Sequence, residues 1–341
     1  MSFTKKQNLL FIILLLVMMF LFLVNISLGS VSIPLKEVVN GLLSQEMSKE
    51  SWEIILWNFR FPKAVTAILV GIGLSMSGLL MQTLFRNPLA GPYVLGLSSG
   101  ASLGVAFIIL GTGFLPTFIS SFFLSNHGLI LASSLGSLLV FMAVLLVSKK
   151  LKDTMAILIV GLMFGSFTSA IVSVLSYFTT AEKLQKFTFW SMGSISNLSW
   201  NEISLLSVFV IIGIGISFMV IKPLNALLLG EKYAQSIGIN YKKTRFLIII
   251  ATSILAGSIT AFAGPIAFIG LAVPHMAKLL FQTSNHFVLF WSTLLLGAIV
   301  MLCCDTIAQV PGNDITLPIN AITSVIGAPV VIWLLVRKKR F

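Results

Sequence analysis

Long apolar runs alternate with short polar segments along most of this chain. A helix needs about 20 predominantly apolar residues to cross a bilayer. Ten runs approach or reach that length, and they cover residues 9–28, 64–84, 93–110, 129–147, 155–178, 203–221, 246–262, 267–281, 287–308 and 318–336. The pattern predicts an all-α, polytopic membrane protein of about ten transmembrane helices.

The first run follows Lys5 and Lys6, an arrangement that signal peptides and first spanning helices share. Its apolar stretch exceeds the usual signal core of about 7–15 residues, and no convincing small-residue cleavage site follows, so we predict a retained span with a cytoplasmic N-terminus. An even number of spans then places both termini in the cytoplasm. Of the 22 lysines and arginines, 16 fall on that side and six on the other. This bias supports the orientation.

Two polar segments are too long to be simple turns. In the outer segment 30–59, Val38, Val39, Leu42 and Leu43 recur at helical spacing among polar neighbours, which predicts a short amphipathic helix on the outer face.

The inner segment 222–244 keeps several leucines within a polar loop. Two interpretations carry equal weight: a docking surface for a soluble partner, or a helical hairpin packed on the chain's own spans. With no repeat and no low-complexity tract, residues 1–341 are predicted to form a single permease domain.

Composition agrees with this membrane assignment. Hydrophobic residues make up 57% of the chain and charged residues 9%, whereas soluble domains contain about a quarter charged residues. The net charge of +12 arises from short basic clusters between apolar runs, as membrane topology requires, and not from a nucleic-acid footprint.

The constellations that an enzyme needs are sparse. His127, His275 and His286 lie far apart, Cys303 and Cys304 are adjacent within an apolar run, and no P-loop motif occurs. We therefore expect a non-catalytic chain without a metal or cofactor of its own, so that any ATP dependence comes from a partner.

Glycines within the second span have a packing explanation. Gly71, Gly73 and Gly78 superficially resemble a dinucleotide-binding fingerprint, but they fall inside a predicted transmembrane helix. Small residues there allow close helix approach.

Asp305 is the good candidate for a carboxylate inside the membrane. Such groups often mark a proton path. A structural pairing is favoured here, and proton coupling through Asp305 is the alternative.

Arg60 and Lys63 stand at the outer end of the second span, against the charge bias, with Pro62 between them. They could receive carboxylates of an external protein or an anionic ligand, or simply extend to the interface. At the inner side, FRNPLAGP (85–92) predicts a rigid, kinked connection, and GPIAFIGLAVP (264–274) predicts a broken helix at membrane depth.

Four motifs together relate this sequence to one known family. RFPKAVTAILVGIGLSMSGLLMQTLFRNPLAGPYVLGLSSGASLG (60–104), LNALLLGEKYAQSIG (224–238), GPIAFIGLAVPHMAKLL (264–280) and LPINAITSVIGAPVVIWLL (317–335) together resemble the FecCD family. These are permeases of type II ATP-driven importers that carry iron siderophores, haem and cobalamin, and the match spans about residues 60–337.

The resemblance implies a multi-pass protein of the bacterial cytoplasmic membrane that pairs with a second copy or a paralogue. A cytoplasmic ATPase dimer, which holds ATP and Mg²⁺, would dock below, and an extracytoplasmic binding protein above. It assigns ATPase coupling to Leu224, Asn225, Leu227, Leu229, Gly230, Glu231 and Gly238. It assigns a cytoplasmic gate to Asn87, Leu89 and Thr154. It assigns docking of the binding protein to Arg60, Lys63 and Gln309.

Three positions depart from the family's pattern. Lys63 stands where arginine is common, Gln309 replaces a basic residue in DTIAQ, and the usual ELPVG reads TLPIN over 316–320. The predicted function is that of a permease subunit for an iron chelate, with a ferric siderophore as the first choice. Haem and cobalamin remain open, and the rival from another class is a proton-coupled secondary transporter.

Overall fold

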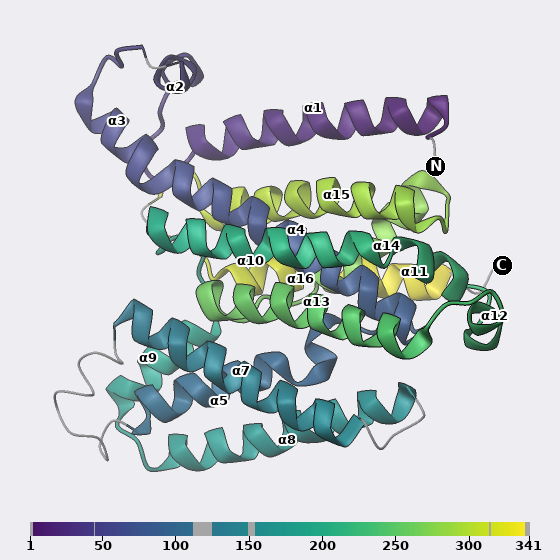
Figure 1. Ribbon diagram of the computed structural model, residues 1–341. Coiled ribbons are helices and arrows are strands. Elements are labelled where there is room, and N and C mark those ends of the chain that lie inside the picture. The colour runs from purple at the N-terminus through teal and green to yellow at the C-terminus, as the bar shows by residue number, and fades with distance from the viewer. Residues whose placement is uncertain (1–2, 44, 112–124, 149–153, 314, 338–341) are drawn as a thin grey trace.

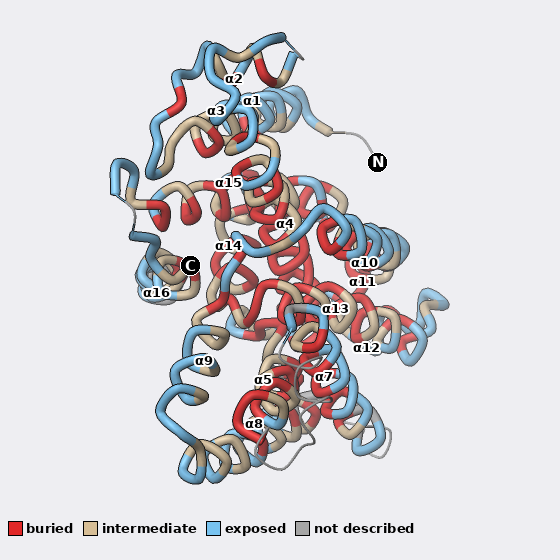
Figure 2. The backbone as a smooth tube through the Cα atoms, turned by 90° about the vertical axis from the view of Figure 1, so that its left-hand side faces the viewer, coloured by how far each residue is buried: buried red, intermediate tan, exposed pale blue. Residues whose placement is uncertain are grey.

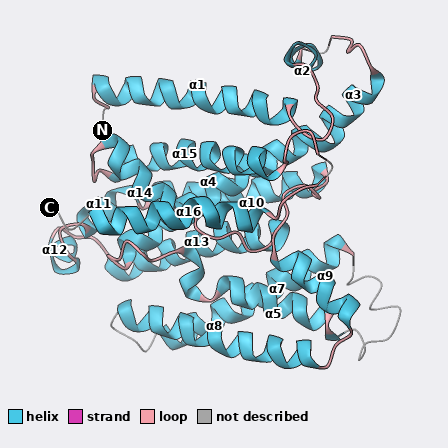
Figure 3. Ribbon diagram, turned by 180° about the vertical axis from the view of Figure 1, so that it is seen from behind, coloured by secondary structure: helices cyan, strands magenta, loops and turns pink. Residues whose placement is uncertain are grey.

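A computed structural model describes residues 3–43, 45–111, 125–148, 154–313 and 315–337. Within these ranges the chain is helical, with turns and loops but no β-strand (Figure 1). Both ends of the chain lie at one end of the helix assembly, and the helices of the 30–59 segment lie at the opposite end (Figure 3). This arrangement agrees with an even number of spans.

Seven described helices are long and apolar enough to cross a membrane. They are α1 (Lys5–Ser27), the continuous stretch Glu50–Leu84 that ends in α4 (Phe61–Leu84), α7 (Asn126–Ser148), α8 (Thr154–Tyr177), α10 (Trp200–Met219), α13 (Tyr241–Ala263) and α15 (His286–Ala308). Three shorter apolar helices are α5 (Leu97–Ile109), α14 (Ile269–Phe281) and α16 (Ile319–Arg337). Together they occupy the ten predicted runs.

Shorter helices connect these spans: α2 (Leu35–Leu42), η2 (Pro92–Leu95), α9 (Ala181–Ser191), α11 (Ile221–Leu227) and α12 (Glu231–Ser236). Helix α3 (Glu50–Ile55) and η1 (Leu56–Arg60) form the start of the continuous stretch Glu50–Leu84. Helix α2 is the predicted amphipathic helix, and its Val38 is buried while Leu43, just beyond its end, is exposed. Helix α9 was not predicted.

The second span begins earlier than the apolar run suggested. Helix α3 continues through η1, a π-helical turn, directly into α4. Pro62 has no N–H to donate to the carbonyl four residues earlier, and a wider turn just before it accommodates that missing bond.

Helix α4 forms the centre of the core, where it contacts α15, α13 and α14 (Figure 2). Its glycines permit these contacts. A Cβ at Gly71 would lie 2.2 Å from the carbonyl oxygen of Gly297, and one at Gly78 would lie 1.8 Å from that of Gly270. The prediction that small residues allow close helix approach is confirmed.

Helices α5, α7, α8 and α9 form a second group beside the core (Figure 1). Gly104 and Gly136 bring α5 and α7 together, because a Cβ at Gly104 would meet the Ala132 carbonyl oxygen at 2.0 Å. Both helices also contact α13, which joins this group to the core.

Candidate functional site

A buried polar cluster surrounds Asp305 near the outer end of α15. The Lys63 Nζ lies 3.0 Å from Asp305 Oδ1. Asp305 Oδ2 accepts hydrogen bonds from Asn25 Nδ2 at 2.8 Å and from Gln309 Nε2 at 2.9 Å. The carboxylate therefore joins α1, α4 and α15, and the favoured prediction of a structural pairing is confirmed.

Arg60 binds the C-terminal end of α1. Its Nη1 donates to the carbonyl oxygens of Ile26 at 3.0 Å and Ser27 at 2.7 Å, and its Nη2 donates to that of Val31. The side chain is buried. A cation at a helix C-terminus satisfies carbonyls without helical partners and complements the helix dipole.

Arg60, Lys63 and Gln309 thus all lie at the same end of the helix assembly, as a shared docking role requires. Each of them binds a partner within the chain through its side-chain nitrogen, and Arg60 and Gln309 are buried. Their contact with a binding protein stays a prediction. Because Lys63 already pairs with Asp305, a carboxylate of the binding protein would compete with Asp305 for the Lys63 ammonium.

The connection between α4 and η2 turns sharply at the inner end. Arg86 adopts a left-handed backbone with φ of 48°. Asn87 Oδ1 accepts the Leu89 N–H at 2.9 Å, the Pro88 carbonyl oxygen lies 2.9 Å from His275 Nε2, and the Leu89 side chain is exposed. The connection is therefore kinked, as the two prolines predicted.

The third residue of the predicted gate is Thr154, the first residue of α8. Its side chain lies outside the described part of the structure, as do residues 149–153 before it. The gate assignment for Asn87, Leu89 and Thr154 stays a prediction.

The inner segment 222–244 folds as a helical hairpin. Leu224 and Leu227 are buried against the spans, whereas Leu228 and Leu229 are exposed. The first two leucines anchor α11 on the chain's own spans, as the hairpin interpretation predicted, and the docking surface for a soluble partner stays a prediction. Their predicted coupling role is not tested by this packing.

Two turns explain the glycines of this segment: Gly230 lies between α11 and α12, and Gly238 lies between α12 and α13. Gly230 has φ of 122° and Gly238 has φ of 87°, values that residues with a side chain rarely adopt. Glu231 begins α12, and its Oε1 accepts from Gln235 Nε2 at 3.1 Å.

One hydrogen bond joins the gate connection to the hairpin. Arg86 Nη2 donates to the Leu227 carbonyl oxygen at 2.9 Å. The structure therefore brings the predicted gate residues Asn87 and Leu89 to the same end as the predicted coupling residues, and the predicted docking residues lie at the other end.

The helix break predicted over 264–274 forms in its first half only, because Pro274 lies inside α14 (Ile269–Phe281). Helix α13 ends at Ala263, Gly264 adopts φ of 74°, and α14 starts at Ile269. Asn320 Oδ1 accepts the Ala267 N–H at 2.9 Å, so a side chain replaces one of the backbone partners that the break removes.

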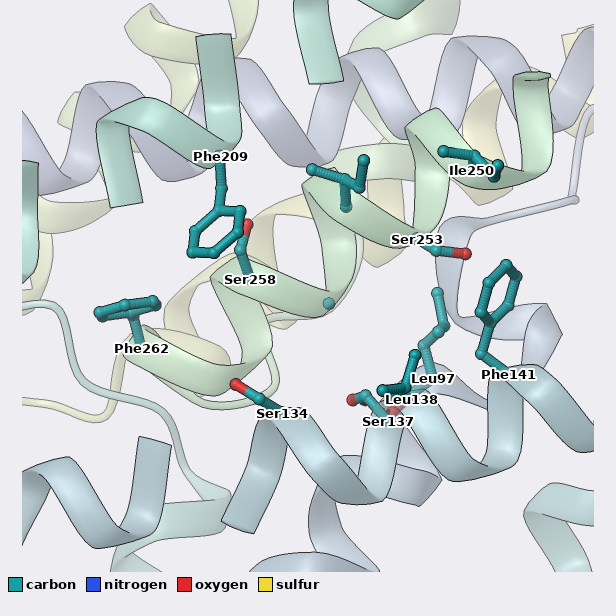
Figure 4. A pocket seen from close by; sticks show the side chains of 12 residues that line it. Leu97, Ser134, Ser137, Leu138, Phe141, Phe209, Ile250, Ser253, Ser258 and Phe262 are labelled. Carbon is teal, nitrogen blue, oxygen red and sulfur yellow. Dashed lines mark hydrogen bonds between the residues drawn. The ribbon is translucent and has the colours of Figure 1, made fainter. Parts of the chain in front are cut away.

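An apolar groove lies between α7, α10 and α13, with a volume of about 270 Å³ (Figure 4). Leu138, Phe141 and Phe209 contribute to its lining, and Ser137 Oγ donates to the Leu97 carbonyl oxygen at 2.9 Å. None of its twelve lining residues is ionisable, so this groove offers no charge to a ligand.

The family model described as the FecCD transport family matches residues 15–337. The chain belongs to this family. FecCD proteins are permeases of ABC importers, which are membrane subunits without catalytic activity of their own and which work with ATPase and binding-protein partners. The alternative of a proton-coupled secondary transporter is therefore not supported.

This FecCD permease has similar relatives among vitamin B12 permeases. It is 36% identical over 289 residues to the vitamin B12 import system permease protein BtuC of Salmonella typhi, which covers 84% of this chain and 85% of that protein. The corresponding protein of Citrobacter koseri is 34% identical over 289 residues and 84% of each chain.

Solved structures of transport proteins share the fold of this chain. A metal-chelate type ABC transporter in an inward-facing conformation is similar with a TM-score of 0.84 and 28% identity, covering 97% of this chain and 99% of that one. PsaBC from Streptococcus pneumoniae is similar in fold alone, with a TM-score of 0.54 and 13% identity over 88% and 95% of the two chains.

Three features near these sites have no prediction from the sequence. They are the hydrogen bond between Asn25 and Asp305, the role of Asn320 at the helix break, and helix α9. Only α9 had a local signal, because Glu182 and Lys186 are spaced to pair on a helix, and their ion pair is 3.0 Å long.

Proposed function

We propose that this FecCD permease carries a bulky metal chelate, and first of all a ferric siderophore, across the bacterial cytoplasmic membrane. The observation that carries the proposal is the close likeness in fold, over almost the whole chain, to a metal-chelate type ABC transporter. Because the fold sets the width of the path between permease subunits, a shared fold favours cargo of similar size.

Cobalamin is the second candidate cargo. The curated relatives at 36% identity are permeases named for vitamin B12, which is itself a bulky metal complex. Haem is the third cargo that the family carries.

Uptake by the complete importer separates these cargoes. The permease would be reconstituted in proteoliposomes with its cognate ATPase and binding protein, and labelled ferric siderophore, haem and cobalamin would be offered at equal concentration. We expect at least tenfold faster ATP-dependent uptake of a siderophore. Faster uptake of cobalamin would support the second candidate, and uptake of none by a complex that hydrolyses ATP would contradict the chelate assignment.

We propose an assembly of two permeases, an ATPase dimer that holds ATP and Mg²⁺, and a binding protein on the outer face. Apolar side chains such as Phe167 and Val174 on α8 and Val325 and Ile332 on α16 are exposed in the single chain, and a second permease or lipid would cover them. ATP binding would shift the population of inward and outward states through the 222–244 hairpin.

Leu229 tests the position of the ATPase. Its side chain is 68% exposed at the turn of the hairpin. A charge there would have to be desolvated in an apolar contact, so Leu229→Asp is expected to weaken ATPase binding at least tenfold. The measurement is the amount of ATPase that copurifies with the permease in a salt series.

Leu43 provides the matched control. It is the same residue type with a similar exposure, 65%, but lies in the outer 30–59 segment. Leu43→Asp should leave the ATPase bound. Equal binding of the ATPase by both variants would contradict an ATPase site on the hairpin.

A further inference from the structure

A buried histidine connects three segments at the inner end. His286 is the first residue of α15 and is 1% exposed. Its Nε2 lies 2.8 Å from Thr83 Oγ1 and its Nδ1 lies 3.1 Å from Asn225 Oδ1. The same amide oxygen accepts the His286 backbone N–H at 2.7 Å. His286 belongs to none of the predicted docking, gate or coupling residues.

The partners determine which ring nitrogen carries the proton. Asn225 Nδ2 donates to Asn285 Oδ1 at 3.3 Å, which fixes the amide so that its oxygen faces His286. That oxygen cannot donate, so Nδ1 must carry the hydrogen, and Nε2 of the neutral ring then accepts from the Thr83 hydroxyl. The Thr83 oxygen also lies 3.0 Å from the Leu79 carbonyl oxygen, so its one hydrogen has two acceptors in reach.

These bonds join the hairpin to the gate connection. Asn225 belongs to α11, Thr83 belongs to the last turn of α4, and the gate connection with Asn87 and Leu89 follows at once. The bond from Arg86 to the Leu227 carbonyl oxygen is a second tie between the same segments. A displacement of α11 must therefore either move the inner end of α4 or break these hydrogen bonds.

We propose that Asn225 and His286 are positioning residues that transmit the displacement of the hairpin to the inner end of α4. The role rests on the proposed function, because it requires an ATPase that moves α11. Without the Asn225–His286–Thr83 connection, the ATPase would still bind the exposed part of the hairpin and hydrolyse ATP, but the gate connection would no longer follow.

The test measures the number of ATP molecules hydrolysed per chelate imported by the complete importer in proteoliposomes. Asn225→Leu and His286→Phe remove the polar groups at similar volume. We expect each to raise this ratio at least tenfold, and His286→Phe, which lies outside the hairpin, should leave the ATPase bound in the wild-type amount. His286→Gln keeps a donor and an acceptor, and should restore the ratio to within about threefold of wild type.

If the larger core substitutions prevent folding, Thr83→Val tests the same connection with a smaller change. It removes one hydroxyl from the connection, and the expected rise in the ratio is about threefold. Thr66→Val is its matched control, because Thr66 is also buried on α4 and donates to the carbonyl four residues earlier, at the outer end. Thr66→Val should leave the ratio unchanged.

The outcomes separate this inference from the proposed function. If the wild-type complex shows no ATP-dependent uptake, the proposed function fails. If the wild type couples ATP hydrolysis to uptake, and every folded variant keeps its ratio despite a lower melting temperature, the connection is only a structural anchor and the inference is overturned. Equal rises for Thr83→Val and Thr66→Val would overturn it as well.

Discussion

Replacing Asp305 with alanine is expected to destabilise the folded permease by about 3–5 kcal/mol, because it leaves the Lys63 ammonium without its counter-ion in a largely buried site. The same change removes the acceptor of Asn25 and Gln309. The measurement is the unfolding free energy in detergent micelles, from a denaturant titration that follows helix content.

The double variant Lys63→Met with Asp305→Leu is the control. It removes both charges together, so no unpaired ion remains, and well-packed apolar replacements of a buried pair are often neutral. We expect it to be markedly more stable than Asp305→Ala. If the single and double variants lost the same stability, the ion pair would not be the cause.

The folded double variant also tests two roles of these residues. If Lys63 docks the binding protein, the affinity of the binding protein for this variant should fall and become less dependent on salt. Unchanged affinity would contradict that role. If Asp305 carried protons, uptake should stop in this variant. We expect ATP-driven uptake to continue.

Gly78→Ala is expected to cost at least about 3 kcal/mol or to prevent folding. The added Cβ would lie 1.8 Å from the Gly270 carbonyl oxygen and 2.5 Å from its carbonyl carbon, and both are backbone atoms at the start of α14. Backbone cannot turn aside as a flexible side chain can, so α4 and α14 would have to separate. Melting temperature and the yield of monodisperse protein measure the effect.

Gly215→Ala is the matched control, since Gly215 also lies within a span but has nothing within 4 Å of an added Cβ. Alanine favours the helix over glycine, so this variant should be neutral or more stable by up to about 1 kcal/mol. A similar loss of stability in both variants would show that close packing of α4 on α14 is not what Gly78 provides.

The sequence predicted the elements well wherever a local pattern specifies them. Apolar runs located the spans because a bilayer requires a minimum apolar length, and Gly264 revealed the break before α14 because glycine disfavours a helix interior. Pro274 did not mark a break, since it lies within α14. The pattern of Val38 and Leu42 predicted α2 in the same way. Helix α9 was missed because its apolar face is weak and its one signal, the pairing of Glu182 with Lys186, is small.

The sequence predicted which residues belong to the candidate sites but not which residues they contact. The motifs pointed to Arg60, Lys63 and Gln309 at one end and to Asn87 at the other. They did not show that Lys63 pairs with Asp305 or that Arg60 binds the end of α1, because those partners are far apart in the sequence. Likewise, the spacing of the leucines in the hairpin could not show that Leu224 is buried.

Local patterns alone thus determined that this chain crosses the membrane about ten times, which way it is oriented, and where its glycines and prolines interrupt or bring together helices. Those properties depend on segment length, charge and backbone geometry, each of which is encoded within a few neighbouring residues. Only the tertiary structure decided that Asn25 meets Asp305 and that His286 joins Asn225 to Thr83. Such contacts depend on which helices pack together, and the net energy that selects one packing is shared among residues distributed over the whole chain.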